Sequence, residues 1–278
     1  MVKALKLKLV LLALCFLAGS VLFAAEFRFV QIADTELDET PVQDAHLCKI
    51  IDSINKLPFD IEFVVHTGDI VAPAKTLSEK ANAIEARKKF KALKPPVYYV
   101  PGNHDIMTID TRKCISNFET YFGPLFQKTV VKNVAIYFVW ADMNYHDVFL
   151  ANYDPLACLT AEMSKNPDQP AIIFTHIPPD KGFYANIVRP GWKPGIKEKW
   201  IKTLSKFNVK AMVCGHMHRD ELQHLGKIPV YIGSSACDLY GRASTYRIYH
   251  YKDGVLDYCT IYPGDQDLHS KKKAAETK

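Results

Sequence analysis

The sequence predicts an α/β fold in which mixed β-sheets carry helices on their outer faces. Two observations indicate this class. Apolar runs typical of strands alternate with helical patterns as far as residue 214, and strands then follow one another without helices. The 278 residues are 48% hydrophobic and 23% charged, as in a globular protein with a sizeable core. The sequence has no internal repeat and no low-complexity linker, so we expect one folded domain.

Three strands and two helices are expected in the N-terminal part of the chain. The strands are the apolar runs 27–33, 61–65 and 97–100. Thr40 offers an N-cap and Pro41 a first-turn proline for the first helix. Its apolar face would contain Val42, Ala45, Leu47, Ile50, Ile51 and Ile54. Thr76 and Glu79 have the spacing of a capping box, which predicts a second helix from there to Leu93.

The rest of the chain continues this alternation and then becomes rich in strands. Further strands are expected at 134–140, 171–174, 209–214 and 229–232. One helix would begin at Asp154-Pro155, again an N-cap followed by a first-turn proline, and another would cover 200–207. The last two strands, 246–251 and 255–262, have no helix between them, which indicates a meander.

The N-terminal segment, residues 1–25, has the composition of a secretory signal peptide. Three lysines precede the apolar run 9–23, and Ala24-Ala25 provides small residues for cleavage. The alternative is an uncleaved anchor, although this apolar run is short for a membrane-spanning helix. We therefore expect cleavage after residue 24 or 25 and a secreted or periplasmic protein.

The formal net charge of +5 comes from the two ends of the chain. Residues 26–270 contain 28 basic and 29 acidic side chains. A nucleic-acid-binding domain needs an excess of positive charge on its folded face. We therefore expect a domain over 26–264 that binds no nucleic acid, followed by a basic flexible tail over 265–278. Once the signal peptide is removed, we expect no stable association with a membrane.

Five of the expected strands run directly into groups of metal-ligating side chains. These groups are Asp34-Thr35-Glu36, Gly68-Asp69, Gly102-Asn103-His104-Asp105, His176 and Gly215-His216-Met217-His218. Ligands in α/β proteins gather at the carboxyl ends of strands, where loops converge on one edge. Carboxylate, imidazole and amide donors together suit Mn, Fe, Zn or Mg. A single Gly-Asp turn or a lone histidine would be weak evidence, but all five groups in order predict a metal site.

In this order, the five groups resemble the motifs of the calcineurin-like metallophosphoesterases, over about residues 27–262. Softer motifs resemble the group around calcineurin-like phosphoesterase domain-containing protein 1, a phosphoprotein phosphatase. They are YYVPGNHD at 98–105, His176-Ile177-Pro178, and Ser234-Ser235-Ala236 followed by Gly241-Arg242. The resemblance implies a four-layer α/β/β/α sandwich of two mixed sheets flanked by helices, with two divalent metal ions at one edge.

The resemblance also implies roles for individual residues. The ligands of one ion would be Asp34, Glu36, Asp69 and His218. The ligands of the other ion would be Asp69, Asn103, His176 and His216. His104 would be the general acid, oriented by Asp105, while a metal-bridging hydroxide attacks phosphorus.

The first motif departs from the family, which usually has Asp-x-His where this chain has Asp34-Thr35-Glu36. Glu36 would be a hard oxygen ligand that shifts the metal preference from Zn toward Mn, Mg or Fe. In the alternative interpretation, Glu36 points to solvent and one ion binds weakly. The sequence leaves both interpretations open.

Two arginines and one long segment are candidates for substrate contacts. Arg242 and Arg219 could bind phosphate oxygens through their guanidinium groups, or could form ordinary surface ion pairs. The segment 180–199 contains Phe183 and Trp192 and could form an aromatic wall over the site, or pack on the body of the domain.

These observations together predict an exported, divalent-metal-dependent phosphoesterase that hydrolyses phosphomonoesters of small molecules or proteins. A phosphodiesterase, including one for cyclic nucleotides, is the alternative within enzymes, because the same core serves both reactions. A metal-binding protein that has lost turnover through the change at Glu36 is the alternative outside enzymes. The presence of the expected general acid His104 and of the expected metal ligands favours an enzyme.

Overall fold

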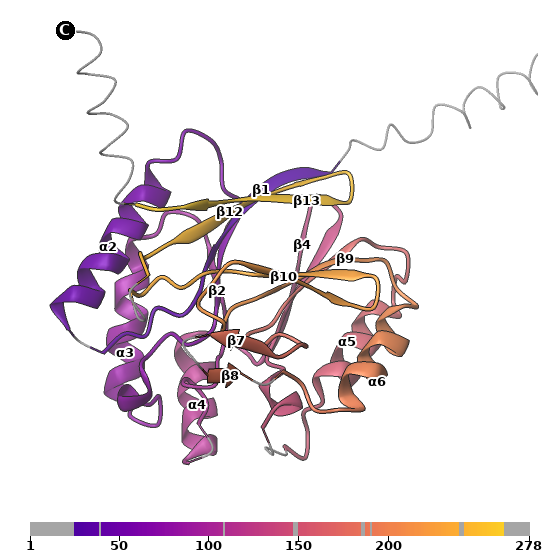
Figure 1. Ribbon diagram of the computed structural model, residues 1–278, viewed down its shortest axis with the longest axis horizontal. Coiled ribbons are helices and arrows are strands. Elements are labelled where there is room, and N and C mark those ends of the chain that lie inside the picture. The colour runs from indigo at the N-terminus through magenta and orange to yellow at the C-terminus, as the bar shows by residue number, and fades with distance from the viewer. Residues whose placement is uncertain are drawn as a thin grey trace, which may run out of the picture.

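The computed structural model describes residues 25–38, 40–107, 109–146, 150–184, 187–189, 191–238 and 242–263. The expected signal peptide, apart from Ala25, and the expected tail lie outside these residues. The described residues form two large mixed sheets with helices on their outer faces (Figure 1). The α/β sandwich expected from the sequence is therefore confirmed.

The first sheet has five strands, and its centre is parallel. Its order is β13 (Val255–Ile261), β12 (Tyr246–Lys252), β1 (Glu26–Ile32), β2 (Phe63–Thr67) and β3 (Val97–Val100). β1, β2 and β3 run parallel, whereas β12 is antiparallel to β1 and to β13. The carboxyl ends of β1, β2 and β3 therefore lie at the same edge of the sheet.

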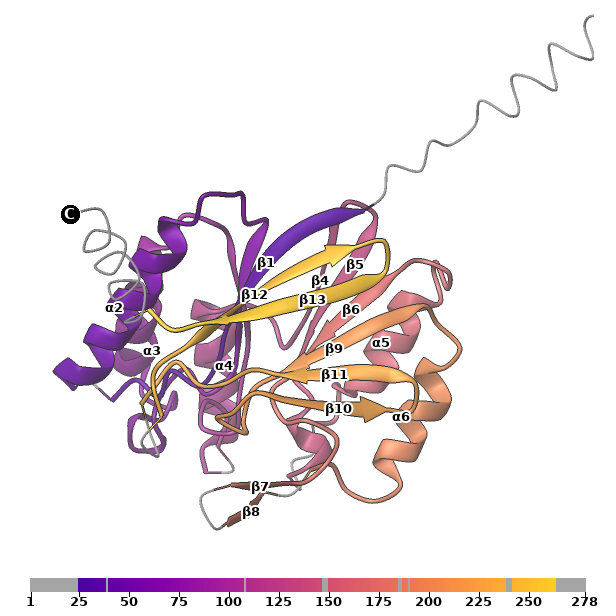
Figure 2. The same cartoon turned by 45° about the horizontal axis from the view of Figure 1, so that its top comes forward.

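The second sheet has six strands and is also parallel at its centre. Its order is β10 (Glu221–Leu225), β11 (Ile228–Ile232), β9 (Val209–Cys214), β6 (Ala171–Phe174), β5 (Val134–Val139) and β4 (Phe126–Val131). β5, β6, β9 and β11 run parallel, and the edge strands β4 and β10 are antiparallel to their neighbours. A separate hairpin, β7 (Gly182–Tyr184) with β8 (Ile187–Arg189), belongs to neither of these sheets (Figure 2).

Apolar side chains hold the four layers together. Phe29 of β1 stacks on Phe63 of β2, with ring centroids 5.0 Å apart, and meets the edge of Phe174 of β6 at 5.3 Å. Such pairs bury large areas of apolar surface between the sheets. The outer face of the first sheet packs against α2 (Pro41–Asn55), α3 (Lys80–Lys89) and α4 (Thr111–Tyr121). The outer face of the second sheet packs against α5 (Pro155–Met163) and α6 (Ile196–Leu204).

The first helix begins where the sequence predicts, but its buried face differs from the prediction. The Thr40 hydroxyl accepts a hydrogen bond from the Gln43 amide, and Pro41 is the first helical residue. Val42 and Ala45 are exposed, so their placement on the apolar face is wrong, and Gln43 is buried instead. With 100° per residue, Gln43 lies within about 40° of Leu47 around the helix, whereas Val42 and Ala45 lie about 140° or more away.

The second helix contradicts the predicted capping box. α3 begins at Lys80 with Glu79 at its N-cap and no side-chain cap. The Thr76 hydroxyl instead accepts a hydrogen bond from the Ser78 amide at 3.2 Å. This local turn satisfies the backbone before the helix starts, which is a common alternative for threonine.

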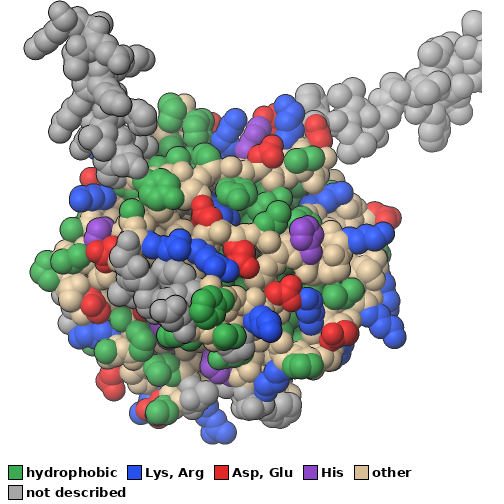
Figure 3. Space-filling model, in the orientation of Figure 1, with side chains coloured by type: hydrophobic (Ala, Val, Ile, Leu, Met, Phe, Trp, Pro, Cys, Tyr) green, Lys and Arg blue, Asp and Glu red, His purple; other side chains and the backbone are tan. Residues whose placement is uncertain are grey.

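The described surface carries mixed charge. On the face shown in Figure 3, Lys and Arg side chains are interspersed with Asp and Glu side chains. Within the described part of the chain, no helix is long and apolar enough to cross a membrane.

Candidate metal centre

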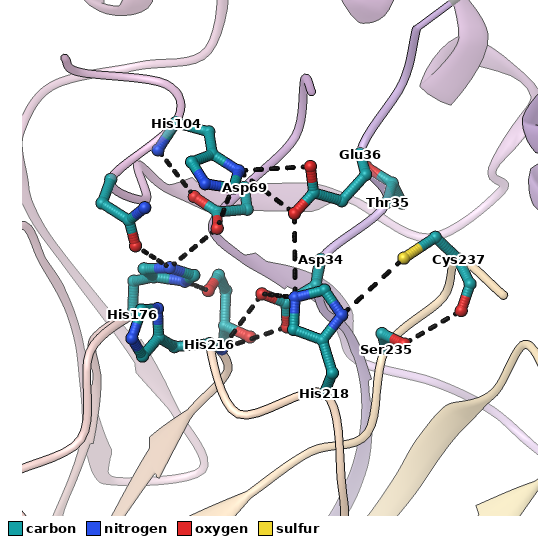
Figure 4. Close-up of polar contacts among 12 residues, drawn as sticks. Asp34, Thr35, Glu36, Asp69, His104, His176, His216, His218, Ser235 and Cys237 are labelled. Atoms are coloured by element: carbon teal, nitrogen blue, oxygen red, sulfur yellow. Dashed lines mark hydrogen bonds and ion pairs between the residues drawn. The ribbon is translucent and has the colours of Figure 1, made fainter. Parts of the chain in front are cut away.

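The five predicted groups of polar residues lie together at one edge of the sandwich. Asp34 follows β1, Asp69 follows β2, and Asn103 and His104 follow β3. From the second sheet, His176 follows β6, and His216 and His218 follow β9. Figure 4 labels Asp34, Asp69, His104, His176, His216 and His218 and shows them gathered from both sheets. The structure therefore brings these residues together.

The backbone at this edge is held in an unusual conformation. Asp34, Glu36, Asp69, His216 and His218 all have φ between 48° and 71°. This left-handed conformation costs about 1–2 kcal/mol for each non-glycine residue. The cost is offset partly by hydrogen bonds from the Asp34 amide to the Gly68 carbonyl, and from the Glu36 amide to the Asp69 carbonyl. Strain of this kind is typical of functional sites.

Two glycines allow the strands to approach closely beneath the site. Gly68 has φ +92°, and a Cβ atom there would lie 2.5 Å from His176 Nδ1. A Cβ atom on Gly102 would lie 2.3 Å from Asp69 Oδ1. Any side chain at these positions would displace Asp69 or His176 from its place in the cluster.

One candidate ligand cluster contains Asp69, His176 and His216, whose ligand atoms lie within 4.8 Å of one another. His176 Nδ1 donates to the Thr67 carbonyl at 2.8 Å, and its Nε2 lies 3.1 Å from Asn103 Oδ1 and 3.3 Å from Asp69 Oδ2. The hydrogen bond to the Thr67 carbonyl fixes the orientation of the His176 ring. Its Nε2 atom therefore faces the candidate ligand atoms of Asn103 and Asp69. This is the usual arrangement around metal-binding histidines.

Asp34, Glu36 and His218 lie close to one another beside Asp69. His218 Nε2 is 3.7 Å from both Asp34 Oδ1 and Glu36 Oε1. The Asp34 carboxylate also accepts from the His216 amide at 3.0 Å. Glu36 is only 3% exposed, so the interpretation in which it points to solvent is wrong.

His104 contacts Glu36 and Asp69, and its relation to Asp105 differs from the prediction. His104 Nδ1 lies 3.1 Å from Glu36 Oε1 and 3.3 Å from Asp69 Oδ2, which makes Glu36, Asp69 and His104 a second candidate cluster. Within the described residues, the Asp105 carboxylate accepts from the backbone amides of Ile70, Val71 and Gly102. Asp105 therefore stabilises the loops, and Glu36 and Asp69 are the carboxylates that orient the His104 ring.

The charges of the site fit a binding site for cations. Burial, together with the negative charges of Asp69 and Glu36, raises the pKa of Asp34. Burial also raises the pKa of Glu36, while burial lowers the pKa of His218 to about 4. Three carboxylates buried side by side are unfavourable unless cations balance them. Imidazole nitrogens and carboxylate oxygens are donors that divalent ions bind in proteins, so the residues present fit two such ions.

Asp142 is a buried residue of this region that the sequence interpretation missed. It follows β5 and accepts from the Ile177 amide, next to His176, at 3.2 Å through Oδ1. Its Oδ2 has no hydrogen-bond partner among the described residues. The other groups were selected because each one follows a strand. Asp142 could have been found in the same way, because it lies three residues after β5, which runs parallel to β6 and β9.

The two predicted phosphate-binding arginines do not lie among the ligands. Arg219 Nε donates to Glu221 Oε2 at 2.8 Å, and its Nη1 donates to the Phe183 carbonyl at 2.9 Å. Arg219 therefore joins the hairpin to β10, as an ordinary ion-pair residue does. Arg242 is exposed. In the segment 180–199, Trp192 is buried in the core, as expected for packing on the body of the domain, and Phe183 is 58% exposed.

The geometry agrees with comparisons to known proteins. Residues 27–220 match the family described as Calcineurin-like phosphoesterase. The chain is 27% identical over 237 residues to the serine/threonine-protein phosphatase CPPED1 of Danio rerio, covering 71% of this chain and 72% of that protein. It is 26% identical over 217 residues to a probable glycerophosphodiester phosphodiesterase GpdQ of Arcobacter nitrofigilis, covering 74% of this chain and 77% of that protein.

Solved structures share the fold. A dimetal phosphatase from Danio rerio superposes with a TM-score of 0.56 at 13% identity, covering 85% of this chain and 98% of that one. The family match spans more than half of the chain, and it confirms the resemblance stated from the sequence motifs. The chain belongs to the calcineurin-like phosphoesterase family.

Proposed function

We propose that this protein hydrolyses phosphomonoesters with two divalent ions bound at the described edge. The observation that carries the proposal is the convergence of three buried carboxylates and three histidines from four strand ends, beside the partly exposed ring of His104, which follows a fifth strand. The relatives include a phosphatase and a probable phosphodiesterase, so the preference for monoesters is our inference.

The proposed ligand sets follow the two sides of Asp69. Asp69, Asn103, His176 and His216 would hold one ion. Asp69, Asp34, Glu36 and His218 would hold the other. Bound divalent ions would polarise the phosphoryl oxygens and acidify an attacking water. The buried oxygen donor Glu36 favours Mn, Mg or Fe over Zn.

His104 is suited to protonate the leaving oxygen. Its side chain is 25% exposed, so a substrate can reach it. Although burial lowers its pKa, the charge of Asp69 and the hydrogen bond to Glu36 raise the pKa of His104 to about 9. The ring therefore carries a proton at neutral pH. General acid catalysis contributes about 10²–10⁴-fold to such reactions.

The test is hydrolysis of an aryl monophosphate and of a bis-aryl phosphate by the full-length chain reconstituted with Mn, Mg, Fe or Zn. The proposal predicts metal-dependent turnover that is faster with the monoester. His104→Gln should lower turnover by about 10²–10⁴-fold, whereas His224→Gln, at an exposed position of β10, should leave it unchanged.

Two results would replace the proposal. Faster hydrolysis of the diester would identify a phosphodiesterase, as the relative GpdQ suggests. A folded chain that binds ions but turns over neither substrate with any metal would be the non-catalytic alternative.

We also propose that residues 1–25 direct export and are removed. The short basic segment, the apolar run and the small residues before Glu26 support this. Mass spectrometry of the protein secreted by its host cells should find an N-terminus at Ala25 or Glu26. Intact residues 1–25 on a cell-associated protein would contradict export.

A further inference from the structure

The β7–β8 hairpin packs directly against the loop that carries His216 and His218. Met217 lies between His216 and His218 in the sequence and is fully buried. A Cβ atom on Gly182 of β7 would lie 2.8 Å from Met217 Sδ, so the hairpin backbone touches the loop that carries both histidines. The bond from Arg219 to the Phe183 carbonyl holds the hairpin in this position.

The register of the hairpin places Arg189 on the face that meets Met217. Gly182 pairs with Arg189, and Phe183 pairs with Val188. Directly paired residues of antiparallel strands share a face, and successive residues alternate. Phe183 and Val188 are 58% and 59% exposed, on the face away from the body. The side chain of Arg189 therefore lies on the same face of the hairpin on which a Cβ atom of Gly182 would lie. This face is turned toward the His216–His218 loop.

Arg189 is partly buried, so its charge is less screened by solvent than that of an exposed arginine.

We propose that Arg189 binds the non-bridging oxygens of the substrate phosphoryl group at the edge of the metal centre. A guanidinium is planar, always charged and able to donate two parallel hydrogen bonds to a phosphate. This inference rests on the proposed function and narrows it. A phosphomonoester dianion carries one more negative charge than a diester, so Arg189 favours monoesters. Arg219 and Arg242 were the arginines expected in this role from the sequence. Arg189 was not among them, because only the fold brings its strand to the His216–His218 loop.

The test compares Arg189→Ala and Arg189→Gln with the wild-type chain and with Lys181→Ala. Lys181 is exposed and immediately precedes β7, so its removal subtracts a positive charge from the same region without touching the Met217 face. The assays are kcat/KM for an aryl monophosphate and a bis-aryl phosphate, and calorimetric binding of inorganic phosphate to the manganese-loaded proteins. Circular dichroism checks that each variant is folded.

We expect both Arg189 variants to lose about 10- to 100-fold in kcat/KM for the monoester and in phosphate affinity, the range of one charge-assisted pair. The loss with the diester should be smaller, and Lys181→Ala should stay within about twofold of wild type. Folded Arg189 variants within twofold of wild type in phosphate affinity would overturn the proposal. Because phosphate binding needs no turnover, a wild-type chain that binds phosphate but hydrolyses nothing would refute the proposed function and not the role of Arg189.

Discussion

Replacing Glu36 by glutamine tests how the His104 ring is oriented. The structure places Glu36 Oε1 and Oε2 at 3.1 and 3.2 Å from His104 Nδ1, with Glu36 buried. Glutamine keeps the size of the side chain and one acceptor oxygen but removes the negative charge. The change therefore converts a charge-assisted hydrogen bond into a neutral one.

The magnitude follows from that conversion. A hydrogen bond to a charged group contributes about 1.5–3 kcal/mol, and a neutral one about 0.5–1.5 kcal/mol. The difference of about 1–2 kcal/mol corresponds to about a 5- to 30-fold loss in kcat, at about 1.4 kcal/mol for each tenfold change. The pKa of His104 should also fall, since the Glu36 carboxylate helps to raise it. A general acid must be protonated, so activity should be lost at a lower pH than in the wild-type chain.

The assay is the pH profile of kcat for an aryl monophosphate at saturating metal, from pH 5 to 10. Asp38→Asn is the matched control, because Asp38 is an acid two residues away whose carboxylate accepts from Thr40 and not from the site. The reasoning is refuted if Glu36→Gln turns over within twofold of wild type with an unchanged alkaline limb. It is also refuted if Asp38→Asn shows the same loss.

Three further changes test other parts of the account. Glu36→His should change the metal-activation profile more than the unfolding free energy, and an unchanged profile would count against Glu36 as a ligand. Gly68→Ala should abolish turnover, because its Cβ would meet His176, whereas Gly195→Ala, with φ +80° but open space, should lose about 1–2 kcal/mol of stability and keep turnover. Burial lowers the pKa of His66 to about 3, so metal-free wild type should lose stability as pH falls from about 6.5 to 3, by up to about 5 kcal/mol. His66→Gln should remove most of this loss in urea unfolding, and an identical pH dependence in both proteins would contradict it.

The sequence predicted the parts of the fold and site that depend on local pattern. β3, β6 and β9 have the predicted bounds, because each is a short apolar run next to clear turn residues. The strand-end groups could be recognised since each one immediately follows its strand, and parallel strands bring such ends to one edge.

Other elements have weak local patterns. α4 presents only Cys114 and Phe118 as buried residues, and β4 and β10 are edge strands with many polar side chains. No strong periodicity marks such segments. Their structure depends on packing against neighbouring elements: β4 pairs with β5, and β10 pairs with β11.

The contacts of the site depend on tertiary structure still more strongly. Glu36 and His104 are 68 residues apart, and their contact requires β1 and β3 to flank β2. Asp105 lies next to His104 in the sequence, yet its carboxylate turns toward the backbone amides of Ile70, Val71 and Gly102. The prediction that Asp105 orients the His104 ring, because the two are adjacent in the sequence, was therefore wrong.

The central claim is that Asp69 joins two ion sites that together support hydrolysis. Its most direct test is the metal content of the full-length chain, measured by plasma mass spectrometry beside monoesterase activity, for wild type and Asp69→Asn. The account predicts two ions in each wild-type chain and active enzyme, with loss of ions and of turnover together in the folded variant. A folded Asp69→Asn variant that retains two ions and wild-type turnover would contradict it.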